Sequence, residues 1–200
     1  MGPAGILKGI AGGCWVGGRY SPVSCDDDRQ GADTFRAAAV TISIRRASAA
    51  DAPALARLCR YVHNLHATER PDVFRPFDLT TTTAHFADVI SSGAQRVLIA
   101  EMAGEPVGYA ALLVRERPEN ALCFGRRWLE IDSACVHPDH RRGGVARSLF
   151  ERADGIACEE GLGVELNTWS FNEGARAAFE AMGFRAQTSR LELRRADPGR

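Results

Sequence analysis

One short segment, residues 136–146, constrains the fold of this chain more than any other part of it. The segment reads Val-His-Pro-Asp-His-Arg-Arg-Gly-Gly-Val-Ala and joins a stretch typical of a strand directly to a stretch typical of a helix. Gly143 and Gly144 let the backbone approach another group closely, and the first N–H groups of a helix have no partner within that helix. Such a turn is an anion site that suits phosphate groups. It lacks both the Walker lysine and the G-x-G-x-x-G pattern of dinucleotide sites.

The apolar spacing after residue 40 predicts a mixed α/β domain, in which helices flank a mostly antiparallel central sheet. A tight connection at residues 104–106 makes the second and third strands a hairpin, and two prolines make residues 67–77 a loop. Ser48 with Asp51, and Ser170 with Glu173, have the spacing of a capping box at a helix start. Strands are predicted at residues 40–46, 96–102, 107–115, 128–136 and 163–168 and around Leu191 and Leu193, and helices at residues 48–66, 84–91, 145–160 and 170–182.

Residues 1–40 differ from the rest of the chain because glycine and an acidic run interrupt every apolar period. Lys8 breaks the only stretch that could be the apolar part of a signal peptide. We therefore expect residues 1–40 to be a flexible, glycine-rich tail outside a single domain of residues 41–200.

Composition excludes several classes of function. Lys plus Arg and Asp plus Glu number 25 each, so the net charge is zero and no basic excess favours a nucleic-acid partner. No apolar stretch approaches the roughly 18 to 20 residues that span a bilayer, so no membrane segment is expected. The cysteines form no C-x-x-C pair, which argues against structural zinc. Several of them lie in apolar periodic segments of a domain large enough to fold without disulfides, which favours reduced thiols in a cytoplasmic protein. They are Cys14, Cys25, Cys59, Cys123, Cys135 and Cys158.

Two motifs carry a resemblance to a known family. Arg141-x-x-Gly144-x-Ala146 matches the R/Q-x-x-G-x-G/A signature of the GCN5-related N-acetyltransferase (GNAT) family, and Val136-His137-Pro138 precedes it at the family's spacing. Residues 172–184 are similar to the family's N-x-x-A…Y…G-F segment. With the order of the predicted elements, the resemblance covers roughly residues 41–195. It implies the GNAT-like acyl-CoA N-acyltransferase fold and acetyl-CoA as co-substrate, without a metal.

The resemblance also implies how acetyl-CoA is held. Backbone N–H groups from Arg142 to Ala146 would bind the pyrophosphate with the help of the helix dipole, and the two arginines would add charge. In the family, pantetheine pairs with an open strand edge. The backbone N–H of Val136 would then stabilise the developing oxyanion of the thioester. The implied binding residues are Val136, Arg141, Arg142, Gly143, Gly144, Val145, Ala146, Asn172 and Phe179.

Acetyl transfer to an amine needs a base, because an alkylamine with a pKa of about 10.4 is protonated near neutral pH. Glu130 and Asp132 stand two apart on the strand before the turn, so they are predicted to share one face. Their positions resemble two alternative base sites of the family. Cys135 is predicted by alternation to face away from both, which argues against an acyl-cysteine intermediate.

The leaving group departs from the family's pattern. Phe179 stands where the family usually has a tyrosine that protonates the thiolate of coenzyme A, and a phenyl ring donates no proton. A thiol of pKa about 8.5 also leaves as the thiolate, so catalysis does not depend on that acid. Tyr109 is an alternative acid and equally a core residue. A competing hypothesis is a non-catalytic acyl-CoA-binding module in which Phe179 marks the loss of catalysis.

The acceptor is left open by the sequence: a small amine, an antibiotic, an amino acid or a protein amine. The loop from His66 to Phe77 is expected to line its site, as the equivalent region does in the family. Acidic residues there would favour a cationic amine. These are Glu69, Asp72 and Asp78, together with Glu130 and Asp132. His63 and His66 stand three apart on a helix without an H-E-x-x-H pattern, so we assign them to the acceptor wall and not to a metal. A homodimer is also left open.

Overall fold

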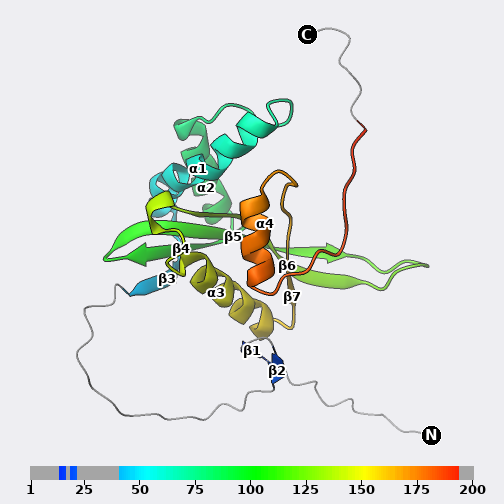
Figure 1. Cartoon of the computed structure of the whole chain (residues 1–200). Helices are drawn as coiled ribbons and strands as arrows, with labels where there is room; N and C mark the ends of the chain where they lie inside the picture. Colours follow the sequence, from blue (N-terminus) through cyan, green and yellow to red (C-terminus); the bar gives the residue numbers. More distant parts are fainter. Residues whose placement is uncertain (1–13, 17–18, 22–40, 194–200) are drawn as a thin grey trace, which may run out of the picture. The chain divides into compact units, whose positions relative to one another are not determined.

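The computed structural model describes residues 14–16, 19–21 and 41–193 (Figure 1). The chain divides into two compact units, residues 1–167 and residues 168–200. Within residues 1–40, where the flexible tail is expected, only β1 (Cys14–Val16) and β2 (Arg19–Ser21) are described, and they pair antiparallel. The rest of the expected tail lies outside the described residues.

The first unit is built around a five-stranded sheet in the order β3-β4-β5-β6-β7. Its strands are β3 (Ile42–Arg46), β4 (Arg96–Met102), β5 (Glu105–Arg117), β6 (Arg126–Val136) and β7 (Gly163–Leu166). Neighbouring strands from β3 to β6 pair antiparallel, and β7 pairs parallel with β6. The prediction of a mixed, mostly antiparallel sheet is confirmed.

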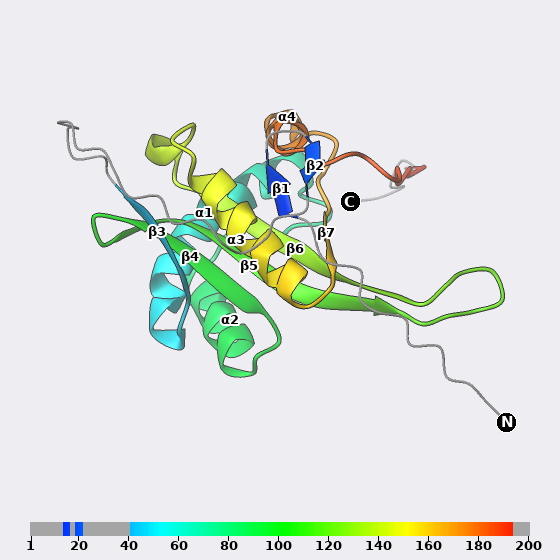
Figure 2. The same ribbon diagram turned by 90° about the horizontal axis from the view of Figure 1, so that it is seen from below.

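Three helices cover the two faces of this sheet: α1 (Ala52–Glu69) and α2 (Leu79–Ser91) on one side and α3 (Val145–Glu159) on the other (Figures 1 and 2). On the first side, Leu55 of α1 and Phe86 of α2 belong to one buried cluster with Ile99 and Tyr109 of the sheet. On the other side, Gly108 has no side chain, and a Cβ there would meet Val145 and Leu149 of α3. Alternation along the strands therefore supplies both cores.

The helix starts follow their capping residues. The capping box of Ser48 and Asp51 is confirmed, with a 3-10 turn at Ala49–Asp51 before α1. The helix predicted at residues 84–91 begins instead at Leu79, because the Asp78 carboxylate accepts a hydrogen bond from the N–H of Thr81 and caps it there. The connecting loop is accordingly shorter than predicted, since α1 also continues to Glu69.

The second unit holds α4 (Glu173–Ala181). Its N-cap is Asn172, whose side-chain oxygen accepts from the N–H of Ala175 at 3.3 Å, so the capping box predicted at Ser170 is wrong. Gly183 follows the helix with a φ of +98°, in the left-handed conformation expected past a helix end. The last predicted strand is also wrong: among residues 184–193 no strand is described, and Leu191 and Leu193 are exposed. Alternating apolar residues do not form a strand without a neighbour to bond to.

Candidate active site

The sheet has an open edge beside the second half of β6. The pairing of β7 with β6 begins at Trp128 and ends where Ile131 stands opposite Leu166. From Ser133 to Val136, β6 pairs only with β5 among the described strands. The N–H of His137 donates to the carbonyl of Val107 at 2.8 Å, so alternation directs the N–H of Val136 away from β5. A main-chain donor of β6 thus points to the open edge.

The turn that follows β6 presents further N–H groups. A 3-10 turn at Pro138–His140 leads to Arg142 and Gly144, whose φ angles are +63° and +86°. Gly144 is the N-cap of α3, and it has no side chain to cap the helix. In the part of the chain that the structure describes, no hydrogen-bond acceptor is assigned to the N–H groups of residues 142–147. The predicted anion-binding turn therefore has its donors at the start of a helix, where the dipole adds to them.

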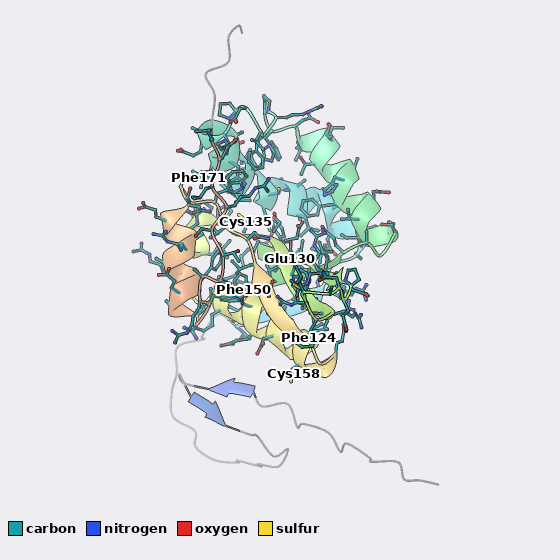
Figure 3. The ribbon with its side chains drawn as sticks, turned by 90° about the vertical axis from the view of Figure 1, so that its right-hand side faces the viewer. Phe124, Glu130, Cys135, Phe150, Cys158 and Phe171 are labelled. Atoms are coloured by element: carbon teal, nitrogen blue, oxygen red, sulfur yellow. The ribbon has the colours of Figure 1, made fainter. Side chains whose placement is uncertain are left out.

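The two candidate bases lie together because of a β-bulge. Ile131 pairs with Leu112 and Ser133 with Ala111, so Asp132 is an extra residue without a partner on β5. Arg115 of β5 reaches both carboxylates: its Nη2 lies 3.3 Å from Oε1 of Glu130 and 3.7 Å from Oδ1 of Asp132. The prediction that Glu130 and Asp132 share one face is confirmed by this common partner. Glu130 is buried, and its place on β6 is labelled in Figure 3.

The same bulge overturns the expectation for Cys135. Cys135 pairs with Tyr109 and Glu130 with Leu113, and these two β5 residues lie on one face, so Cys135 faces the same side as Glu130. Counting residues fails because the bulge adds one. Burial raises the pKa of the Cys135 thiol to about 11, so it stays protonated near neutral pH. An acyl-cysteine is disfavoured by burial and not by orientation.

Tyr109 is not available as an acid for the leaving group. It is fully buried in the core beside α1 and α2, and its hydroxyl bonds to the hydroxyl of Ser133 at 2.8 Å. Burial, with the neighbouring Cys59, raises the pKa of Tyr109 well above its ordinary value. The core reading of this residue is the one the structure supports.

The acidic residues of the loop after α1 are engaged within the fold. Asp72 holds the guanidinium of Arg70 through two contacts of 2.8 Å, and the Arg70 residue is only 7% exposed. Asp78 caps α2, and hydrogen bonds from Thr81 lower the pKa of its carboxyl. Because Asp72 and Asp78 already have partners within the fold, fewer carboxylates of this loop than expected can bind a cationic acceptor.

The histidines of α1 pack against aromatic rings of the same loop. His63 lies edge-on to Phe74 and Phe77, and its Nε2 is 2.8 Å from the carbonyl oxygen of Arg75. Burial lowers the pKa of His66, and the nearby His63 lowers it further. These contacts fit the predicted place in a wall, and no group of three metal-ligating side chains occurs among the described residues.

Other predicted site residues lie in the second unit. The Asn172 side chain caps α4, and the ring of Phe179 lies edge-on to that of Phe184 at 6.2 Å. The role of both residues in binding coenzyme A stays a prediction. A shallow depression of about 460 Å³ lies elsewhere, between the loop that joins β5 to β6 and the residues that follow α3, and none of the predicted site residues lines it.

Arg115 and Gln95 were missed by the sequence analysis. Gln95 donates from Nε2 to Oδ2 of Asp132 at 3.0 Å, so it holds the oxygen that Arg115 does not contact. No residue pattern points to Gln95. Arg115 would have been found only from the register of β5 and β6, which the loop between them does not fix.

Three further findings concern the described residues alone. Cys59, Cys123, Cys135 and Cys158 are free thiols. Burial raises the pKa of Cys59. None of the helices of the described segments is both long and apolar enough to cross a membrane.

Comparison with known families decides the identity. A sequence model of the acetyltransferase (GNAT) family matches residues 60–184, which include β6, the turn and the start of α3. The chain belongs to the GNAT family. The predicted family and fold are confirmed, and the general chemistry of the family is acetyl transfer from acetyl-CoA. A search of the curated proteins found no match.

Solved structures share the GNAT fold of this chain. A tetramutant of the BH1408 protein from Bacillus halodurans is 27% identical, with a TM-score of 0.72 over 76% of this chain and 99% of that one. An aminoglycoside N-acetyltransferase, AAC(6')-Iy in complex with CoA, is 18% identical, with a TM-score of 0.63 over 81% and 99%. A ribosomal-protein-alanine N-acetyltransferase from Brucella melitensis biovar Abortus 2308 is 24% identical, with a TM-score of 0.56 over 78% and 100%.

Proposed function

We propose that this GNAT protein transfers the acetyl group of acetyl-CoA to a primary amine of an acceptor, by direct attack in a ternary complex. The observation that carries the proposal is the continuity between the open edge of β6 and the N–H-rich turn before α3. A strand edge suits the amides of a pantetheine arm, and the turn suits a pyrophosphate. The names of two neighbours, both N-acetyltransferases and one in complex with CoA, support the same chemistry.

Successive parts of acetyl-CoA are assigned to successive parts of the site. The N–H groups from Arg142 to Ala146 would hold the pyrophosphate, with charge from Arg141 and Arg142. Gly144 adopts a φ of +86°, which lets the backbone turn toward the phosphates without strain. The N–H of Val136 would donate to the thioester oxygen as negative charge develops on it.

The amine must lose a proton before or during attack. Near pH 7, freeing an amine of pKa about 10.4 costs about 4 to 5 kcal/mol. Glu130 is the proposed base, directly or through one water, and Asp132 is its alternative. The ammonium first gives one proton to the carboxylate, which releases it to solvent. The free amine nitrogen then bonds to the acetyl carbon, its second proton passes to the carboxylate, and the carbon–sulfur bond breaks with its electron pair on sulfur. The thiolate then leaves without a side-chain acid, since Phe179 cannot donate.

The test is a panel of amines, from polyamines and aminoglycosides to amino acids and peptides, with release of the coenzyme A thiol as the readout. Release that depends on an amine, together with an acetylated product, supports the proposal. Tight binding of acetyl-CoA without turnover on any amine would favour the non-catalytic acyl-CoA-binding module. A cytoplasmic location is part of the proposal, and the free thiols of the described residues fit a reducing compartment. A homodimer is to be tested by sedimentation.

A further inference from the structure

We propose that Arg115 is a positioning residue that orients the Glu130 carboxylate toward the acceptor amine; the inference rests on the proposed function. The Nε of Arg115 lies 3.3 Å from Oε2 of Glu130, and its Nη2 lies 3.3 Å from Oε1. The planar guanidinium therefore faces both carboxylate oxygens at once. The last side-chain torsion of a glutamate is broad, and a two-point contact restricts it.

The backbone fixes this contact. Arg115 stands opposite Trp128 in the β5–β6 ladder, and Glu130 stands opposite Leu113. Arg115 and Glu130 are thus diagonal neighbours on one face of an antiparallel pair, a spacing that long side chains can bridge. Because both residues are on paired strands, the direction in which the carboxylate points is set by the sheet and not by a loop.

Arg115 also compensates a repulsion. The bulge places the Asp132 carboxylate near that of Glu130, and the Nη2 of Arg115 lies 3.7 Å from it. One guanidinium between two carboxylates leaves the cluster with a net charge of about −1, which attracts an ammonium group. Each carboxylate oxygen has more than one lone pair, so Glu130 can still accept a proton while it bonds to Arg115.

If Arg115 only stabilised the fold, its loss would lower the melting temperature and leave the turnover of the folded protein unchanged. The Arg115 side chain is 46% exposed, and half-exposed ion pairs contribute little to folding stability. The Glu130 side chain is only 11% exposed, so its oxygens depend on this partner for orientation. Loss of Arg115 is therefore expected to change turnover far more than the melting temperature.

The experiment compares Arg115→Ala with Arg127→Ala, a matched control. Arg127 lies on the same hairpin, is also exposed, and pairs with Glu116 away from the cluster. With an acceptor from the amine panel, Arg115→Ala is expected to lower kcat about ten- to a hundredfold, the scale of a misplaced catalytic group. The KM for a cationic amine should stay equal or fall, because the cluster becomes more negative. Arg127→Ala should match the wild type.

Added guanidinium ion should restore part of the kcat of Arg115→Ala and none of that of Glu130→Gln. Arg115→Lys should restore less than the native arginine, since an ammonium is a point charge that cannot match both oxygens. If Arg115→Ala keeps wild-type kcat, or if its loss is not rescued by guanidinium while its melting temperature and acetyl-CoA affinity are unchanged, the inference is wrong and the proposed function stands. If Arg115→Ala does not fold, Arg115→Gln takes its place in the same assay. A wild-type protein without turnover on any amine would overturn both.

Discussion

Replacing Gly144 by valine separates two effects at the turn before α3. Gly144 has a φ of +86°, and a side chain in this region costs about 1 to 2 kcal/mol, more for a β-branched residue. A Cβ at this position would meet only Cδ1 of Ile42, at 3.9 Å, so no clash adds to that cost. The variant should fold, with a melting temperature lower by roughly 2 to 8 °C.

Binding of acetyl-CoA should suffer more than folding. The valine side chain keeps the pyrophosphate from the backbone, and one or two hydrogen bonds to a charged group contribute about 1.5 to 3 kcal/mol each. A loss of about 3 kcal/mol corresponds to at least a hundredfold weaker affinity. Calorimetric titration with acetyl-CoA, well below the melting temperature, measures this. Gly143→Ala is the milder comparison, since its Cβ would lie 3.4 Å from the carbonyl oxygen of His140. Unchanged affinity in folded Gly144→Val would refute the assignment of the turn.

Three further predictions concern the general base, the N-terminal tail and the loss of folding stability at low pH. Glu130→Gln should lower turnover about a hundredfold with coenzyme binding intact, and the loss should shrink at high pH, where more amine is unprotonated; a silent Glu130→Gln beside an impaired Asp132→Asn would exchange their roles. A chain that begins at residue 40 should melt within a few degrees of full length, and a larger loss would show that the tail packs on the domain. Hydrogen bonds from Arg45 hold the pKa of the Asp51 carboxyl well below its ordinary value, so its stabilisation is complete above about pH 4 and is lost as the pH falls through the folded pKa. Asp51→Asn should therefore flatten the melting temperature below about pH 4, and an unchanged slope there would contradict this assignment.

Much of the sheet could be predicted from sequence because its signals are local. The apolar runs of β4 and β5 and the two-residue turn at Ala103 and Gly104, both with positive φ, need no distant partner. The start of α3 was equally readable, since two glycines and an apolar stripe mark it. The start of α2 could not be predicted, because four threonines, which favour strands, lie near its beginning, and that beginning depends on the cap at Asp78.

The candidate site was predicted in its main-chain part and incompletely in its side chains. The turn follows from a strand that runs into a helix, and the donor at Val136 was expected from the resemblance to the GNAT family. The face of Cys135 and the partner of Glu130 depend on which residues stand opposite each other in the ladder. That register is decided by the packing of whole strands, and counting along one strand cannot reveal it.

Asp132 is an extra residue in the β5–β6 ladder, because every other residue from Leu129 to Val136 has a partner on β5. Those residues would keep the same partners if Asp132 were deleted. The bulge therefore adds a second carboxylate to β6 while the residues on both sides of it stay paired with β5. Excision would also remove the bend and the added twist that a bulge imposes. In a β6 without this bend, the residues after Ile131 would lie in line for pairing with the chain after Leu166, and main-chain hydrogen bonds would then occupy the edge that is now open. The bulge that adds an acid to one face thus stands at the point where β7 stops pairing with β6, and the edge of β6 beyond it has no partner strand among the described residues.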